Sequence, residues 1–264
     1  MTELAARVRR EPPRFRRVTV ARTELLSPHL LRVTLTGPEL AGFDPGLPAA
    51  SVRTLLPSPG TDHLVVPSWE GNEFLLADGE RPIIRTYTPR RFDSLALELD
   101  LDVVLHDAGV ASAWARGAQP GDPAAISGTG RGYTIDPEAT SFVLGGDEAA
   151  IPAISVLLEA LAPAARVDVL IEVSHPDARL ELPAHPGATV TWRHRSSTVR
   201  HGHELAQAIT EAPIAPEAHI WVAGEAAAVQ RVRRHLFDDR GLARSQCTVR
   251  GYWKYGRAGA SDDP

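Results

Sequence analysis

The sequence contains one cysteine, Cys247, among its 264 residues. A single thiol cannot form an intramolecular disulfide, a cysteine-ligated iron–sulfur cluster or a cysteine zinc site. The chain also lacks a run of about 18 apolar residues that would span a membrane, and its first residues carry charges in place of the apolar segment of a secretory signal. These absences lead us to expect a cytoplasmic protein that neither enters a membrane nor depends on disulfides.

An excess of positive charge is missing as well. Lysine and arginine number 28 together, and aspartate and glutamate 33, which gives a formal net charge of −5. This balance argues against nucleic acid as a partner, although a local basic patch is compatible with it. Hydrophobic residues make up 43% and charged residues 23% of the chain, as in ordinary globular proteins. At this length the composition predicts two domains, each with its own core.

The first half of the chain has the pattern of short β-strands. Runs rich in β-branched residues alternate with proline and glycine turns, and the expected strands cover residues 17–23, 30–36, 51–57, 83–88 and 95–104. The last of these runs alternates apolar with acidic residues, which is typical of a strand with one face in water. Several short strands separated by turns predict an antiparallel barrel or sandwich.

The pattern changes near Asp136-Pro137, and strands then alternate with helices. Strands are expected at residues 141–146, 167–173, 188–192 and 219–224, and helices at 149–161, 204–209 and 226–236. Asp147-Glu148 stands where acidic residues favour a helix N-terminus. This alternation predicts a parallel α/β sheet. We therefore divide the chain into a barrel domain, residues 1–138, and an α/β domain, residues 139–264.

Two strand ends in the α/β half are candidates for ligand contact, because open parallel sheets bind ligands beyond the carboxyl ends of their strands. One carries Gly145-Gly146-Asp147 and the other Gly224-Glu225. Glycine lets a flat ligand or a phosphate approach the backbone, and the following helix presents N–H groups. The alternative is that these are ordinary helix-entry turns. Residues 128–132, with three glycines, look like a dinucleotide fingerprint, but no helix pattern follows, so we interpret them as a loop.

In the barrel half the strongest local signal is Arg85-Thr86-Tyr87-Thr88, at the end of an expected strand. Arg85 and Tyr87 share one strand face. The arginine can form paired hydrogen bonds with a pyrophosphate, and the tyrosine can lie on a flat ring system. Further along, Gly109 and Ser112 stand at the expected start of a short helix, where backbone N–H groups bind anions well. The alternative is a half-exposed strand with ordinary surface residues.

At these residues the sequence resembles the siderophore-interacting proteins, which are ferric-siderophore reductases related to the ferredoxin-NADP reductase superfamily. The matching motifs span most of the chain, and their order and spacing are more specific than any single piece. In chain order they are Arg85-x-Tyr87-Thr88-x-Arg90, His106, Gly109-x-Ala111-Ser112-x-Trp114-Ala115, Pro120-Gly121-Asp122, Gly128, Gly146-Asp147-Glu148-x-Ala150-Ile151-Pro152, Trp192 with Arg195, Ala223-Gly224-Glu225 and Gly251-Tyr252-Trp253-Lys254-x-Gly256.

The resemblance implies an N-terminal FAD-binding Greek-key β-barrel and a C-terminal Rossmann-like α/β domain that binds NADH or NADPH, with a last segment that returns toward the flavin. It implies that Arg85 holds the FAD pyrophosphate, that Tyr87 packs on the flavin and that Thr88 lies near its reactive nitrogen. Tyr87 and Thr88 are thus the expected catalytic residues. The further cofactor-binding residues that it implies are Arg90, His106, Gly109, Ala111, Ser112 and Trp114 on the flavin side, and Gly145, Gly146, Asp147, Gly224 and Glu225 on the nicotinamide side.

Three positions depart from the family pattern. The family's histidine is usually followed by glycine and its later glycine by proline, where this chain has Asp107 and Val110. Because Asp107 would repel a diphosphate, we expect its side chain to point away. Ala149 stands where the family has threonine, which removes a hydroxyl there but leaves the helix start in place.

The implied reaction is FAD-dependent reduction of a ferric siderophore by NAD(P)H. The hard oxygen donors of a siderophore suit Fe(III) better than Fe(II), so reduction loosens the metal. Because ferric siderophores are frequently anionic, we expect Arg53, Arg250 and Lys254 to line a cationic substrate entrance; the alternative is a set of solvated surface charges. We expect a monomer without a metal site of its own, since the nearest candidate, His201-Gly202-His203, has the pattern of surface residues before a helix.

Other functions stay open at this point. A general flavin or ferredoxin-type reductase would share every flavin residue and differ only at the substrate entrance. A non-catalytic flavin-binding sensor would bind FAD without oxidising NAD(P)H. Ferredoxin could replace the nicotinamide as donor, and Arg193 or Arg195 could meet the 2′-phosphate of NADP. The sequence identifies neither the siderophore nor the donor.

Overall fold

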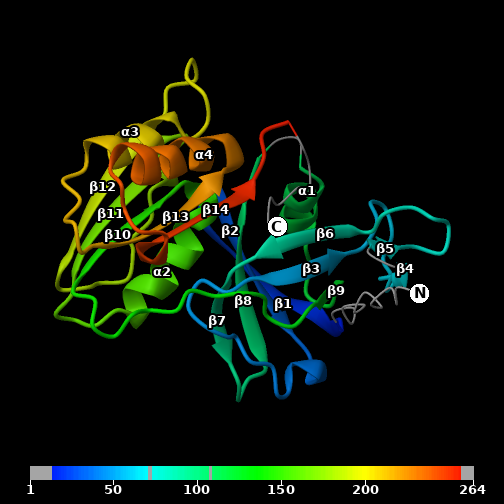
Figure 1. Ribbon diagram of the computed structural model, residues 1–264. Coiled ribbons are helices and arrows are strands. Elements are labelled where there is room, and N and C mark those ends of the chain that lie inside the picture. The colour runs from blue at the N-terminus through cyan, green and yellow to red at the C-terminus, as the bar shows by residue number, and fades with distance from the viewer. Residues whose placement is uncertain (1–13, 71–72, 107–108, 257–264) are drawn as a thin grey trace, which may run out of the picture.

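The computed structural model describes residues 14–70, 73–106 and 109–256, which are built around two large sheets (Figure 1). Asp107 lies outside the described residues, and with it the expectation that its side chain points away from a diphosphate. Within these ranges no helix is both long enough and apolar enough to cross a membrane.

The N-terminal sheet has seven strands, paired antiparallel in the order β6-β3-β9-β1-β2-β8-β7. Its strands are β1 (Arg16–Ser27), β2 (Leu30–Thr36), β3 (Val52–Leu56), β6 (Ile83–Tyr87), β7 (Pro89–Asp93), β8 (Glu98–Val104) and β9 (Pro123–Ile126). The same half contains the small hairpin of β4 (Ser68–Glu70) and β5 (Glu73–Leu75), the 3-10 turn η1 (Pro38–Leu40) and the helix α1 (Val110–Gly117).

The strand order forces this sheet to curl. Its two edge strands, β6 and β7, are consecutive in the chain, and only Thr88 separates them. The two edges must therefore come together at Thr88, which we call the seam of the barrel. The predicted antiparallel barrel is confirmed as a curled half-barrel whose two edge strands are joined at this seam.

Strand β8 differs from its prediction. The sequence predicts that its acidic face lies in water, and this is wrong, because Asp100 is 9% and Asp102 6% exposed. The guanidinium of Arg32 on β2 donates to both carboxylate oxygens of Asp102, at 2.7 and 2.9 Å, and the hydroxyl of Thr34 donates to Asp100 at 2.7 Å. Buried carboxylates require such partners. Here the partners lie on the neighbouring strand, where the pattern of β8 alone does not reveal them.

The C-terminal sheet has five parallel strands in the order β12-β11-β10-β13-β14. These are β10 (Ser141–Gly146), β11 (Arg166–Val173), β12 (Ala188–His194), β13 (His219–Glu225) and β14 (Cys247–Trp253). The chain runs outward from β10 to β12 and then returns to β13 on the other side of β10. The place between β10 and β13 is therefore a topological switch point, where doubly wound sheets bind their ligands. The predicted parallel α/β half is confirmed, with β14 as a strand that the sequence pattern missed.

Helices cover both faces of this sheet (Figure 1). They are α2 (Ile151–Ala160), preceded by the 3-10 turn η2 (Glu148–Ala150), then α3 (His203–Glu211) and α4 (Ala226–Arg234), which continues into a π-helical turn, η4 (His235–Asp239). Phe142 and Leu144 of β10 pack with α2 in one apolar core, whereas Val143 packs with α3 and α4 in another. Because β10 contributes side chains to an apolar core on each side of the sheet, both of its faces are apolar, which explains its continuous hydrophobic sequence.

Two arginines connect the halves of the chain. Arg90 on β7 donates to both carboxylate oxygens of Glu159 on α2, at 3.0 and 2.8 Å. Arg250 on β14 donates to the backbone carbonyls of Arg131 and Gly132, at 3.0 and 2.9 Å, in the segment that links the two sheets. Charge-assisted bonds of this kind are stronger than neutral ones. They fix the α/β half against the barrel and against the linker.

We predict that Leu144→Ala lowers the free energy of unfolding by about 2 to 5 kcal/mol, because Leu144 is 0% exposed and the truncation leaves a cavity between β10 and α2. Val190→Ala on the outer strand β12, where Val190 is 39% exposed, is the matched control and should change it by about 0.5 kcal/mol or less. Urea denaturation measures both. Equal effects of the two substitutions would contradict the placement of β10 at the centre of the sheet.

Candidate functional site

The seam of the barrel brings together the residues that the sequence assigns to the flavin. Arg85 and Tyr87 lie on one face of β6, opposite Thr54 and Val52 of β3. Arg85 is partly exposed, and Tyr87 packs against the barrel core. Thr88, at the seam itself, is 7% exposed. A cation, an aromatic ring and a hydroxyl therefore stand within four residues where the two sheet edges meet.

The phenol of Tyr87 stays protonated at neutral pH. Burial raises the pKa of Tyr87 to about 12, although the charge of Arg85 acts in the opposite direction. An uncharged aromatic ring is suited to packing on a flat ring system such as a flavin.

The guanidinium of Arg85 is available to an anion. Its Nη1 donates to the carbonyl of Ile84 at 2.8 Å, and no carboxylate in the described part of the chain pairs with it. Arginine presents several donors in a rigid fork that matches phosphate oxygens. A partly exposed cation without an acidic partner, beside a neutral aromatic ring, fits the pyrophosphate and the ring system of FAD.

Helix α1 begins where the second phosphate contact is predicted. Gly109 is its N-cap residue, and a Cβ at this position would lie 2.2 Å from Cε1 of His106, so a larger residue would require the exposed ring of His106 to move. The hydroxyl of Ser112 accepts from the backbone N–H of His106 at 3.1 Å and donates to the carbonyl of Val104 at 3.2 Å. Ser112 thus fastens the helix to the end of β8. The first N–H groups of a helix lack intrahelical partners, which leaves them as the anion donors at this end.

Three other residues that the sequence assigns to the flavin are held within the protein. Ala111 is 7% exposed. Trp114 packs against the barrel core, and among the described residues its buried Nε1 has no hydrogen-bond partner. Arg90 forms the bidentate ion pair with Glu159, so its guanidinium binds a carboxylate at the junction of the two halves.

The carboxylate of Asp147 joins three strand ends at the switch point. Asp147 follows β10 and is 3% exposed. Its Oδ1 accepts from the N–H of Ala149 at 3.0 Å, which caps the start of the helical segment. Its Oδ2 accepts from the N–H of Glu225, the last residue of β13, at 2.9 Å, and from the indole Nε1 of Trp253, the last residue of β14, at 2.8 Å. One side chain therefore fixes β10, β13 and β14 relative to one another.

The glycines at these strand ends make room for the protein's own atoms. A Cβ on Gly145, Gly146 or Gly224 would lie 3.1, 2.3 or 2.7 Å from the nearest atom of a neighbouring side chain. For Gly224 that atom is the carboxylate Oδ2 of Asp147. Glu225 is 4% exposed, and its side chain caps the start of α4. This packing is that of the helix-entry turns that the sequence left as an alternative, and contact of these residues with a nicotinamide stays a prediction.

The cations beside the neighbouring strand ends are paired. Nε of Arg195 lies 3.6 Å from the buried carboxylate of Glu172, which also accepts two backbone N–H bonds at the start of α3. Arg193 donates to Glu211 at 2.8 Å. Both candidates for a 2′-phosphate thus hold β12 and α3 in place.

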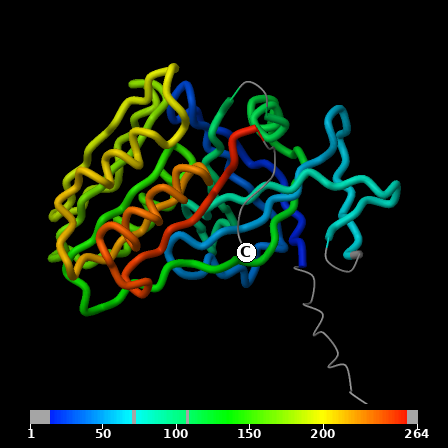
Figure 2. The backbone as a smooth tube through the Cα atoms, turned by 45° about the horizontal axis from the view of Figure 1, so that its top comes forward, coloured from blue at the N-terminus to red at the C-terminus, as the bar shows by residue number. Residues whose placement is uncertain are grey.

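The three cations predicted at the substrate entrance have different environments. Arg250 binds the carbonyls of the linker. Arg53 is exposed and pairs in register with Thr86, so it lies on the opposite sheet face from Arg85. Lys254 is exposed and directly follows β14. In Figures 1 and 2 the red end of this segment reaches the side of the molecule where α1 lies.

Three aromatic rings that the sequence did not group meet beside Asp147. The ring centroid of His201 lies 5.1 Å from that of Trp253 and 4.8 Å from that of Tyr255. Burial, together with the charge of Arg195, lowers the pKa of His201, so its ring is neutral near pH 7. Tyr255 is 69% exposed. The cluster presents an aromatic surface next to the switch point, and it unites segments too distant in the chain for any spacing pattern to reveal.

A curled antiparallel half-barrel followed by a doubly wound parallel sheet is the fold of the ferredoxin reductase-like flavoproteins. The chain superposes on the ferredoxin reductase of carbazole 1,9a-dioxygenase with a TM-score of 0.69 and 15% identity, over 92% of this chain and 70% of that one. At this identity the likeness shows the fold alone.

The chain belongs to the siderophore-interacting protein family. Residues 19–133 match the siderophore-interacting FAD-binding domain, and residues 139–256 match the siderophore-interacting protein model. A siderophore utilization protein from T. fusca is 35% identical and superposes with a TM-score of 0.83, over 95% of this chain and 96% of that one. The resemblance seen in the sequence motifs is thereby confirmed.

Two curated relatives carry functional names. Ferric vibriobactin reductase ViuB of Vibrio cholerae is 30% identical, over 89% of this chain and 88% of its own length. The NADPH-dependent ferric-chelate reductase of Escherichia coli is 33% identical, over 91% of this chain and 93% of its own length.

We predict that Asp147 makes the stability of the fold depend on pH. Burial, reinforced by the charge of Glu148, raises the pKa of Asp147 from its ordinary value of 3.8 to about 7. Between these values the folded chain holds a proton that the unfolded chain releases, so stability falls as pH rises through this window and levels off above it. Asp147→Asn keeps the size of the side chain and does not titrate.

The free energy of unfolding, measured for both proteins from about pH 5 to about pH 8, tests this prediction. The advantage of the parent protein over the Asn variant should be largest at the acidic end and should shrink as pH rises. A difference that stays constant over this range would contradict it.

Proposed function

We propose that this protein is an FAD-dependent reductase that passes electrons from NAD(P)H to the Fe(III) of a ferric siderophore and releases the iron as Fe(II). The observation that carries the proposal is the partly exposed guanidinium of Arg85, which pairs with no carboxylate among the described residues, beside the neutral ring of Tyr87 at the seam. Membership of the family supports it, since relatives include a ferric vibriobactin reductase and an NADPH-dependent ferric-chelate reductase.

The residues of the barrel bind and orient the cofactor in this proposal. The guanidinium of Arg85 binds one phosphate of the FAD pyrophosphate, and the first N–H groups of α1 bind the other. The ring of Tyr87 would pack on the flavin, and Thr88 would offer its hydroxyl to it. When bound, FAD supplies the conversion of a two-electron hydride into single electrons for ferric ions.

The nicotinamide binds beyond the carboxyl ends of β10 and β13, where the bonds of Asp147 hold the backbone in place. Arg193 and Arg195 are both engaged with carboxylates. Neither offers an unpaired cation to the 2′-phosphate of NADPH, so we expect this enzyme to discriminate little between NADPH and NADH.

The substrate side is proposed to use the exposed cations Arg53 and Lys254 as contacts for an anionic ferric siderophore. Arg250 then acts as a positioning residue, because its guanidinium holds the carbonyls of Arg131 and Gly132. An acidic protein needs such a local excess of positive charge to attract an anion.

Steady-state turnover tests the proposal. FAD-loaded protein is supplied with NADH or NADPH, a ferric siderophore and a ferrous chelator as a trap. We expect two Fe(II) to be trapped for each nicotinamide oxidised. If the protein reduces ferricyanide but reduces no ferric siderophore, the result would support a general flavin reductase instead. Bound FAD without turnover of any acceptor would support a flavin sensor.

Removal of the phosphate contact gives a direct prediction. Arg85→Ala should weaken FAD binding about ten- to hundredfold, the loss expected for hydrogen bonds to a charged group. Arg81→Ala is the matched control, because Arg81 is 81% exposed and its one ion pair within the described residues is with Glu73. Fluorescence titration of the apoprotein with FAD measures both affinities. Equal affinities for FAD in the two variants would contradict the role of Arg85.

Charge reversal at the substrate entrance gives a second prediction. Lys254→Glu should raise the KM for an anionic ferric siderophore about three- to tenfold at low ionic strength, with less effect in high salt. The KM for the nicotinamide should stay unchanged. Arg81→Glu is the control for a change in net charge alone. An equal rise in the siderophore KM for both variants would show that Lys254 has no local role.

A further inference from the structure

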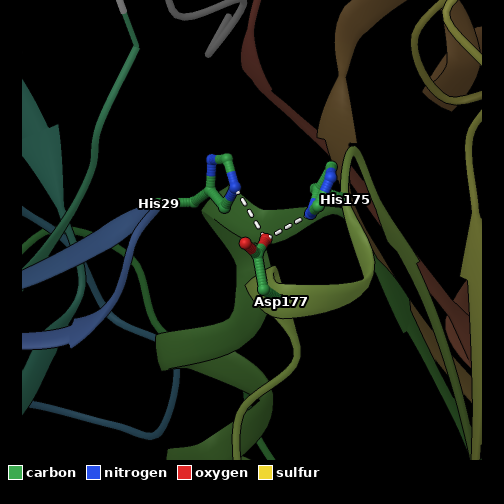
Figure 3. A group of neighbouring side chains, drawn as sticks. All are labelled: His29, His175 and Asp177. Atoms are coloured by element: carbon green, nitrogen blue, oxygen red, sulfur yellow. Dashed lines mark hydrogen bonds and ion pairs between the residues drawn. The ribbon is translucent and has the colours of Figure 1, made fainter.

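Two histidines and an aspartate from opposite halves of the chain converge at the junction of the two sheets (Figure 3). His29 lies in the turn between β1 and β2, and His175 and Asp177 lie just after β11, at the 3-10 turn η3 (Pro176–Ala178). Oδ1 of Asp177 is 2.8 Å from Nε2 of His29 and 2.5 Å from Nδ1 of His175. The three potential ligand atoms all lie within 4.8 Å of one another.

The backbone holds each of these side chains in place. The N–H of His29 donates to the hydroxyl of Ser27 at 3.2 Å, and its carbonyl accepts from the N–H of Leu105 at 2.8 Å. The carbonyl of His175 accepts from the N–H of Ala178 at 3.0 Å, which closes the 3-10 turn around Asp177. The cluster is therefore preformed by two fixed turns.

The ring of His175 has an additional support. It meets the ring of His194 edge to face, with the centroids 6.2 Å apart. The Nε2 of His194 bonds in turn to the carbonyl of Ser174 at 3.0 Å. This contact orients the imidazole of His175 toward Asp177.

Two imidazole nitrogens and one carboxylate oxygen are the ligand set of divalent first-row transition ions. Ligand atoms about 2.0 to 2.1 Å from one ion are about 2.8 to 3.4 Å apart at angles between right and tetrahedral. The separation of Asp177 Oδ1 from Nε2 of His29, 2.8 Å, lies at the lower end of this range, and its separation from Nδ1 of His175, 2.5 Å, must open by about 0.3 Å or more. The side chains of His29, Asp177 and His175 are 33%, 46% and 59% exposed, so an ion can enter and water can complete its coordination.

We propose that His29, His175 and Asp177 bind one divalent transition-metal ion that bridges the barrel and the α/β half. The ion is separate from the iron of the ferric siderophore, and its binding does not depend on the reductase proposal. By joining the β1–β2 turn to the turn after β11, it fixes the two halves of the chain at their junction, as the ion pair of Arg90 with Glu159 does elsewhere.

Titration of the tag-free, full-length protein with Zn²⁺ and with Co²⁺ tests this site. Calorimetry should show one ion bound per chain, and Co²⁺ should give the visible bands of a low-symmetry nitrogen and oxygen site. His29→Ala, His175→Ala and Asp177→Asn should each weaken binding about tenfold or more and remove those bands. Asp177→Asn keeps the size and one acceptor of the side chain, so it separates loss of a ligand from loss of folding, which circular dichroism checks.

His63→Ala is the matched control. Nδ1 of His63 lies 3.4 Å from a carboxylate oxygen of Asp62, and the imidazole is 69% exposed, but no second histidine from the described part of the chain joins this pair. The His63→Ala substitution should leave the affinity for Zn²⁺ and Co²⁺ unchanged. Absence of stoichiometric binding, or binding that the three cluster variants leave intact, would overturn the proposal. The flavin content of each variant is read separately from its visible spectrum, so failure of the metal site and failure of the reductase function are distinguishable.

Discussion

The arrangement of the α/β half depends on one buried carboxylate, that of Asp147. It ends β10, begins the helical segment that leads into α2, and accepts from the last residues of β13 and β14. Backbone N–H groups and an indole N–H are satisfied by the same side chain, and a buried polar group of this kind is costly unless it is so bonded. The switch point, where a ligand is expected, is rigid because its strand ends share this partner.

In the barrel, the candidate site residues are positioned by the chain connection between two strands. Because β6 and β7 are both edge strands and consecutive in the chain, Thr88 must lie where the two edges of the sheet meet. Arg85 and Tyr87 are thereby placed at the seam by topology. Arg90 follows Thr88 by two residues, and its bidentate ion pair with Glu159 connects this part of the barrel to α2. The flavin residues and the attachment of the two halves are thus neighbours in sequence, and a change in one is expected to affect the other.

Much of this was predictable from local patterns. The strand–helix alternation after Asp136, the acidic helix start at Asp147 and the Arg85-x-Tyr87-Thr88 motif each follow from neighbouring residues, and the family motifs added the cofactor. The pattern failed where partners come from elsewhere in the chain. Asp102 is buried with the guanidinium of Arg32, and Asp100 with the hydroxyl of Thr34, as partners on β2. The alternation of apolar and acidic residues in β8 therefore predicted the wrong environment for its acidic face.

The same reason explains the other gaps in the sequence analysis. Strand β14 has no distinctive pattern of its own and is defined by its pairing with β13. The bond from Trp253 to Asp147 and the contact of His29 with Asp177 join positions more than a hundred residues apart, namely 106 and 148. Short-range spacing carries no information on such contacts. Only the fold brings their members together.

In the proposed reaction, one flavin at the seam receives electrons on the nicotinamide side and delivers them to ferric iron. Its most direct test is an anaerobic spectrum of the FAD-loaded protein, recorded after NADH or NADPH is added and again after a ferric siderophore is added. We expect the visible flavin bands to disappear with a nicotinamide and to return with the ferric siderophore, as Fe(II) appears in a trap. Bands that neither nicotinamide removes, or that the ferric siderophore does not restore, would contradict it.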